Sequence, residues 1–225
     1  MAVVVVFCCC VLLALFIAAF ARIWWVLGRR KMEIQPRSKP VKTLIVMGSG
    51  GHTSEMIRLM SGLSDMYNPR MYLIADTDKM SEEKVVEFES KQKPEIFKEE
   101  AAEKQHKDYE ILRIPRSREV KQTYVSSVLT TLYAFKATLP LVHDVKPDLI
   151  LCNGPGTCVP VCIAAVLLKI LGMHNTTLVY IESVCRVKTL SLSGLIMYRL
   201  ADHFMVQWQK LQDAYPKAVF LGRLV

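Results

Sequence analysis

Short apolar segments alternate with longer amphipathic ones along most of the chain. Thr43–Met47 has five apolar or β-branched residues in a row, which is typical of a central parallel strand buried on both faces. Glycines follow it at once, and a helical spacing of apolar residues begins near Thr53 or Ser54. The same alternation predicts six further strands: Met71–Ala75, Glu110–Ile114, Asp148–Cys152, Thr177–Ile181, Phe204–Gln207 and Ala218–Leu221.

Helical patterns lie between these strands. They predict helices at Tyr124–Val145 (with Pro140 bending or ending the regular part), from Thr157 to Leu171, at Leu190–Leu200 and near Gln209–Tyr215. Residues 81–107 mix Glu and Lys, so we expect one solvated helix and a mobile excursion there. Alternating strands and helices predict an α/β fold, an open parallel sheet with helices on both faces.

The amino-terminal segment reads as a membrane span. Ala2–Ala21 carries no charge, and twenty helical residues cross a hydrocarbon core of about 30 Å. Tryptophans and the basic run Arg29-Arg30-Lys31 follow it, as at a membrane interface. A cleaved signal peptide is the alternative, because Ala19-Phe20-Ala21 resembles a cleavage site, but no basic residue precedes the run. We expect an anchor with a basic cytosolic flank at 1–31, a linker at 32–41 and one domain at 42–225.

The distribution of positive charge predicts the orientation. The positive-inside rule places the amino terminus in the lumen and the chain after Arg29 in the cytosol. Asn175-Thr176-Thr177 is a glycosylation sequon, which we therefore expect to stay unmodified. The apolar run Val159–Leu171 is too short for a second span and contains Pro160 and Lys169, so a buried helix is predicted there.

The net charge of +8 does not indicate a nucleic-acid-binding surface. Residues 1–42 hold seven basic residues and one acidic residue, whereas the remaining chain holds 22 and 20. The excess lies beside the predicted membrane segment, where it would attract anionic lipid head groups. No nucleic-acid partner is expected.

The seven cysteines form no C-x-x-C pair, so neither a zinc site nor a redox motif is supported. Cys8, Cys9 and Cys10 lie in the apolar amino-terminal run. The other four, Cys152, Cys158, Cys162 and Cys185, lie in or beside predicted core elements. We predict plain apolar packing in a reducing compartment.

The first glycine turn is the strongest candidate for chemistry. Gly48-Ser49-Gly50-Gly51-His52 links a buried strand to a helix, and the unpaired N–H groups of a helix start bind anions. We predict a phosphate or diphosphate here. The spacing is not a P-loop, and Thr53 replaces the third glycine of the dinucleotide fingerprint. The alternative is a turn needed only for close helix packing.

Other candidates follow the carboxyl ends of later strands, where ligands bind in such sheets. Arg116 and Arg118 suit a diphosphate but also suit solvent or the membrane. His52 could donate to a phosphate oxygen or assist an acceptor hydroxyl, or it could cap or pack. A second glycine loop, opening another helix, contains Asn153, Gly154, Gly156 and Thr157.

Two acidic candidates remain. Glu182 ends an apolar strand, so its carboxylate should emerge in the cleft. There it could orient a sugar hydroxyl or act as a general base, or it could instead pair with Arg186. Asp76-Thr77-Asp78 matches a D-x-D metal motif, but acidic residues after a strand more often cap a helix or turn.

Gly48–Met56, Arg116–Val120 and Asn153–Thr157 resemble motifs of a family of GT-B glycosyltransferases. The chain looks closest to the membrane-anchored subunits of the two-chain UDP-GlcNAc transferase that adds the second GlcNAc to dolichyl diphosphate. It is more distantly similar to the bacterial transferase that makes lipid II.

This resemblance implies a Rossmann-like domain, the amino-terminal half of a GT-B enzyme, on the cytosolic face of the endoplasmic reticulum. It would handle the dolichyl-diphosphate-linked acceptor, whereas a soluble chain (asparagine-linked glycosylation protein 13 type) would bind UDP-GlcNAc. The reaction would be an inverting transfer by the pair, and this chain would not be active alone. The resemblance to the metal-independent GT-B fold also implies no metal, and no cofactor is expected. The carboxyl terminus, Arg223, Leu224 and Val225, would dock the partner.

Two other classes stay open. The first is a membrane-anchored nucleotide-dependent oxidoreductase, with Asp76 as the acid that binds the ribose. The second is a scaffold that only recruits the soluble subunit and contributes no residue to the active site.

Overall fold

The structure is a computed structural model that describes residues 1–28, 39–92, 109–118, 122–154 and 156–225. Several expectations lie outside the described residues. These are the basic run Arg29-Arg30-Lys31, most of the linker 32–41, the later part of the 81–107 segment, and Glu119 and Val120.

The chain builds one seven-stranded sheet in the order β3-β2-β1-β4-β5-β6-β7, and every neighbouring pair is parallel. This confirms the predicted α/β architecture. The strands are β1 Thr43–Val46, β2 Arg70–Ala75, β3 Tyr109–Ile114, β4 Leu149–Asn153, β5 Thr177–Ile181, β6 His203–Val206 and β7 Val219–Phe220.

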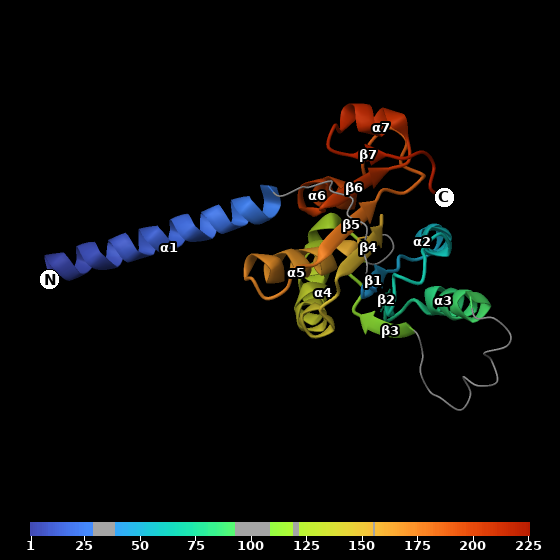
Figure 1. The fold of residues 1–225 in the computed structure, drawn as a ribbon, viewed down its shortest axis with the longest axis horizontal. Coiled ribbons are helices and arrows are strands. Elements are labelled where there is room, and N and C mark those ends of the chain that lie inside the picture. The colour runs from blue at the N-terminus through green and yellow to red at the C-terminus, as the bar shows by residue number, and fades with distance from the viewer. Residues whose placement is uncertain (29–38, 93–108, 119–121, 155) are drawn as a thin grey trace.

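Seven helices complete the described chain (Figure 1). They are α1 Ala2–Gly28, α2 Gly51–Ser61, α3 Lys79–Gln92, α4 Tyr124–Val145, α5 Cys158–Ile170, α6 Leu192–Leu200 and α7 Gln209–Ala214. Helix α2 begins earlier than predicted, since Gly50 takes the N-cap position. Helix α4 continues past Pro140, so the expectation that the proline could end it is wrong.

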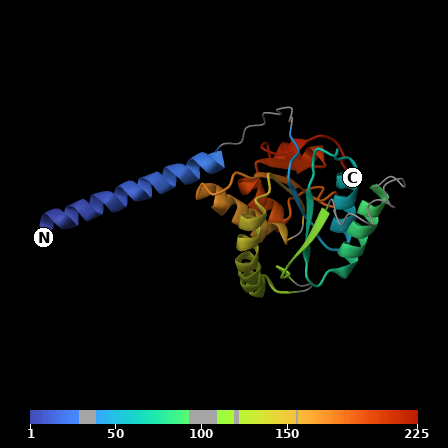
Figure 2. The same ribbon diagram turned by 60° about the horizontal axis from the view of Figure 1, so that its bottom comes forward.

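Alternate residues of the central strands face two separate cores. Leu44 and Val46 of β1 pack on the side of α4, α5 and α6, whereas Ile45 and Met47 pack on the side of α2 and α3. Each of these side chains is fully or almost fully buried, as expected for a strand covered on both faces (Figure 2).

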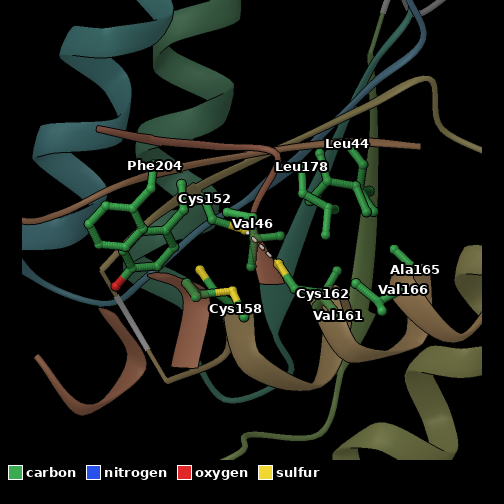
Figure 3. Close-up of a cluster of buried hydrophobic side chains, with 14 of the residues drawn as sticks. Leu44, Val46, Cys152, Cys158, Val161, Cys162, Ala165, Val166, Leu178 and Phe204 are labelled. Atoms are coloured by element: carbon green, nitrogen blue, oxygen red, sulfur yellow. Dashed lines mark hydrogen bonds between the residues drawn. The ribbon is translucent and has the colours of Figure 1, made fainter. Parts of the chain in front are cut away.

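Three cysteines belong to the first core, where they pack with strand and helix side chains (Figure 3). The Sγ atoms of Cys152 and Cys162 are 3.6 Å apart, and burial raises the pKa of the Cys152 and Cys158 thiols above the ordinary value. The thiols of Cys152 and Cys158 therefore stay protonated, and all three cysteines pack as apolar groups, as predicted. Cys185 differs, because it lies exposed on the loop after β5, so the prediction of apolar packing is wrong for this residue.

Two described helices are long and apolar enough to span a bilayer, α1 and the Val125–Val145 part of α4. Helix α1 runs to Gly28, and its last turns contact the end of α5. Arg22 donates from Nε to the Ile170 carbonyl and from Nη2 to the Lys169 carbonyl, each at 3.1 Å. A guanidinium thus satisfies two carbonyls at the carboxyl end of α5.

Helix α5 is a core helix, as predicted, since nine of its residues are buried. Helix α4 packs against it but leaves an apolar row in solvent. We call this row the α4 stripe: Val125, Val128, Leu129, Leu132 and Tyr133. In both ribbon views α4 lies on the side of the domain from which α1 projects and runs across the direction of α1 (Figures 1 and 2).

Candidate functional site

The candidate site lies where the strand order reverses. Strand β1 has β2 on one side and β4 on the other, so the chain leaves β1 toward one face of the sheet and leaves β4 toward the other. In parallel sheets this switch point opens a crevice beyond the carboxyl ends of the two strands. Both predicted glycine loops follow these ends, Gly48–His52 after β1 and Gly154–Thr157 after β4, with Pro155 outside the described residues.

The first loop presents the amino end of α2 to open space. Gly50 has φ 64°, a conformation that favours glycine, and caps the helix without any side-chain hydrogen bond. No heavy atom lies within 4 Å of the place where a Cβ of Gly50 or Gly51 would stand. The space beside the first N–H groups of α2 is therefore open, and the helix dipole makes that space favourable for an anion.

Hydroxyl groups of helices α2 and α3 fix the conformation of this loop through the Gly48 carbonyl. The Gly48 carbonyl accepts hydrogen bonds from the Thr53 and Ser81 hydroxyls, the latter at 3.0 Å. Asp78 in turn accepts from the Ser81 amide at 3.1 Å, so it caps the start of α3. The second aspartate of the D-x-D segment, Asp78, is thus a helix cap, as its position after a strand suggested.

His52 bridges the two loops. Its Nδ1 lies 3.3 Å from Oδ1 of Asn153, the last residue of β4. Gly154, at φ 66°, makes this approach feasible, because a Cβ there would lie 2.6 Å from Cε1 of the His52 ring. The imidazole therefore packs directly on the second glycine loop, which the sequence had placed in the site without specifying this contact.

Glu55 completes the site and was not predicted. The carboxylate is buried and accepts from Asn153 Nδ2 at 3.1 Å, from Ser183 Oγ at 2.7 Å and from the Val184 amide at 3.3 Å. It joins the ends of β4 and β5 to helix α2. The available signal was a carboxylate on the buried face of α2, one position before the core residue Met56.

Glu182 does not emerge in the crevice, so that expectation is corrected. Its side chain is fully buried, and it accepts from the amides of Ser183 and Ser191, at 3.1 and 3.0 Å. Gly194 leaves room for the carboxylate, since a Cβ there would overlap Oε2. Burial raises the pKa of Glu182, although these donors oppose the shift. The residue ties the loop after β5 to the start of α6.

The two predicted arginines lie at the same edge of the sheet, beyond β3. Arg116 Nε donates to Thr77 Oγ1 at 2.8 Å, and Arg118 Nη2 donates to the Gln122 carbonyl at 3.0 Å. The first is half-buried and the second is exposed. Because β3 is separated from β1 by β2, they flank the glycine turn at a distance of two strands.

The carboxyl terminus folds back to this edge. The amides of Leu224 and Val225 donate to Gln207 Oε1 at 3.2 and 3.3 Å, and Arg223 stacks over Trp208. Leu224 packs on the core of the α2 and α3 face. The predicted docking residues therefore lie beside the end of β6, and their role toward a partner stays a prediction.

Comparison with known families gives one match over most of the chain. Residues 43–224 match the family model described as "Oligosaccharide biosynthesis protein Alg14 like". A human protein named UDP-N-acetylglucosamine transferase subunit ALG14 is 52% identical, and the match covers 91% of each chain. Proteins of the same name from Yarrowia lipolytica (42% identical; 85% of this chain and 84% of that one) and Schizosaccharomyces pombe (36%; 92% and 95%) are also similar.

Solved structures share the fold at low sequence identity. Acinetobacter baumannii MurG matches with a TM-score of 0.51 at 15% identity, over 75% of this chain and 42% of that one. A UDP-N-acetylglucosamine 2-epimerase matches with a TM-score of 0.54 at 16% identity, over 80% and 43%. The chain thus spans less than half of each of these structures, and the likeness shows a GT-B-like, Rossmann-like sheet.

Proposed function

The chain belongs to the Alg14-like family of oligosaccharide biosynthesis proteins, and from this premise we propose that it is the membrane-anchored, acceptor-binding subunit of a UDP-GlcNAc transferase. The reaction would add the second GlcNAc to GlcNAc-diphosphodolichol. A separate soluble subunit, of the asparagine-linked glycosylation protein 13 type, would bind UDP-GlcNAc and be recruited to the endoplasmic reticulum membrane.

The observation that carries this proposal is the open amino end of α2 at the switch point. Uncapped amides at the start of α2 face open space, and a half-buried histidine stands beside them. A diphosphate bound at Gly48–His52 would be stabilised by those amides, with Arg116 and Arg118 as flanking positive charges. His52 would then lie near the sugar that the diphosphate carries.

The two subunits would have different roles in the reaction. We assign the nucleotide to the partner, and this chain contributes positioning of the acceptor, which can lower a barrier by several kcal/mol. His52 is the candidate base on this chain. The burial of Glu182 favours a structural role for that residue over direct contact with substrate.

Reconstitution tests the proposal. The full chain and a soluble UDP-GlcNAc-binding subunit are purified and assayed separately and together, with a short-chain GlcNAc-diphosphoisoprenoid as acceptor. We expect transfer only from the mixture. Transfer by this chain alone, or no transfer by a folded complex of the two, would contradict the proposal.

Variants of the turn distinguish acceptor binding from pure recruitment. His52→Ala and Arg116→Ala should lower transfer while the partner still co-purifies. Both residues lie beyond the carboxyl ends of strands, and neither belongs to the carboxyl-terminal segment that is expected to dock the partner. A scaffold that contributes no residue to the site would tolerate both substitutions.

A further inference from the structure

The contacts of His52 indicate which of its two ring nitrogens carries a hydrogen. Asn153 Oδ1 lies against His52 Nδ1, and an amide oxygen can only accept a hydrogen bond. Nδ1 must then carry a hydrogen, which leaves Nε2 of the neutral ring as the unprotonated nitrogen. Among the described residues, Nε2 has no hydrogen-bond partner and is not sealed from solvent.

The orientation of the Asn153 amide is itself determined by chemistry. An amide group could in principle turn over and present its NH₂ to the histidine. Glu55 opposes this, because its Oε2 lies 3.1 Å from Asn153 Nδ2, where a carboxyl oxygen is an acceptor for the NH₂ group. The Ile181 carbonyl is a second acceptor for Nδ2, at 3.5 Å.

Glu55 is fixed from the other side as well. Its Oε2 also accepts from the Val184 amide, and its Oε1 accepts from the Ser183 hydroxyl. The carboxylate is buried, so a turned-over Asn153 would leave it facing an oxygen at hydrogen-bond distance without water between them. The whole chain of contacts therefore has one consistent polarity, from Glu55 through Asn153 to His52.

We infer that Asn153, held by Glu55, is a positioning residue that fixes His52 as its Nδ1–H tautomer and leaves Nε2 as the proton acceptor for the acceptor-sugar hydroxyl. This rests on the proposed function, because a base is required here only if this chain presents the acceptor. The hydroxyl proton moves to Nε2 as its oxygen bonds to the anomeric carbon. The bond from that carbon to the nucleoside diphosphate breaks, and the leaving group keeps the electron pair.

The tautomer can be measured without any activity. The full chain, labelled with [15N]histidine, is bound to its partner in detergent micelles, and long-range 1H–15N correlations report which nitrogen of each of the five histidines carries hydrogen. His52→Gln identifies the signal. We expect Nδ1–H for His52 in the wild type; an Nε2–H signal would overturn the inference, whatever the activity.

Three variants test the role of the contacts that run from Glu55 through Asn153 to His52. Asn153→Leu and Glu55→Met should lose the Nδ1–H preference and lower kcat about 10- to 100-fold, with KM nearly unchanged. The loss is smaller than the roughly 10²- to 10⁴-fold that general-base catalysis supplies, because His52 itself remains. Glu55→Gln should restore both the tautomer and kcat relative to Glu55→Met. Its amide oxygen can take the Oε2 position, and its NH₂ can donate to Ser183 Oγ.

A control variant distinguishes loss of the Glu55–Asn153–His52 contacts from a general loss of stability. Tyr72→Phe removes another buried hydrogen bond, to Glu89 in the core under α3, and should change neither the tautomer nor kcat. A folded Asn153→Leu chain that loses the tautomer but keeps wild-type kcat would overturn the inference. An Nδ1–H signal in a wild-type complex without transfer would instead contradict the proposed function.

Discussion

Gly154 decides how closely His52 can approach the second loop. Gly154→Ala would place a Cβ 2.6 Å from His52 Cε1 at a φ of 66°, so the ring must move and the backbone is strained. We expect transfer to fall by about 10²-fold, the cost of moving a reacting group by about 1 Å. Gly62→Ala, at the end of α2, meets only an ordinary contact and serves as the control. Wild-type transfer by Gly154→Ala would mean that this ring position is not the working one.

Glu182 gives the fold a predictable dependence on pH. Burial raises its pKa in the folded state above the ordinary 4.5, so the folded chain keeps a proton that the unfolded chain releases. The resulting stabilisation is complete below about pH 4.5 and is lost as the pH rises through the folded-state pKa. The Tm difference, wild type minus Glu182→Gln, should therefore decrease from pH 4.5 upward. A constant or increasing difference in detergent-purified protein would contradict this.

The residues found from sequence and those missed differ in the range of their contacts. The first glycine turn, His52 and Asn153 follow directly from strands that the sequence shows. Glu55 was missed because its partners Asn153 and Ser183 are 98 and 128 positions away. The exposure of Glu182 was misjudged because the Ser191 donors that bury it come nine residues later.

At the scale of elements, the α4 stripe has a spacing typical of a helix that lies on a bilayer surface. Its residues recur at i, i+3, i+4, i+7 and i+8, and Val125 and Leu129 are 84% and 70% exposed. The stripe occupies the amino-terminal half of α4, which follows the loop of Arg116 and Arg118. It would therefore hold the candidate site near the membrane.

This placement predicts a selective defect. Leu129→Asp with Leu132→Asp should lower transfer to an acceptor in lipid vesicles several-fold, because the charges oppose insertion of the stripe. Transfer to a detergent-dispersed short acceptor should stay close to wild type. Val86→Asp, on an exposed position of α3 on the other face of the sheet, is the matched control. Equal loss with both acceptors would show that the stripe does not contact the bilayer.

Elements were predictable where the local pattern is strong and less so where backbone geometry intervenes. The strands were located within about two residues, because most of them are short, predominantly apolar runs between turn residues. The start of α2 was placed too late, since Gly50 adopts a conformation that composition alone does not reveal. Helix α4 tolerates Pro140 because that residue is exposed, so water can satisfy the carbonyl that the missing N–H leaves free.

At the scale of the whole molecule, α1 and the candidate site lie at opposite edges of the sheet. Arg22 holds the last turns of α1 to the end of α5, at the edge where the strands begin. The glycine loops lie where the strands end, about 17 Å away for a strand of five residues. Helix α4 runs between the two edges, so a bilayer that holds both α1 and the α4 stripe would meet the domain along its side.

The sequon at Asn175 reports on which side of the membrane this domain lies. Asn175 is exposed in the turn after α5, so an oligosaccharide could be attached if the domain were lumenal. We expect the full-length protein from cells to show no mass shift on treatment with a glycan-removing enzyme. A sequon added before Met1, in the predicted lumenal tail, is the positive control. A glycan mapped to Asn175 would reverse the orientation.

The central position of β1 also matters while the protein is being made. Thr43 pairs with Arg70 on one side, soon after synthesis, but with Leu149 on the other. At translation rates of 5–20 residues per second, the ribosome needs roughly 5 to 20 s to make the intervening chain. Throughout that interval the nascent domain has an unpaired strand edge, which favours aggregation and makes it a client for chaperones until β4 emerges.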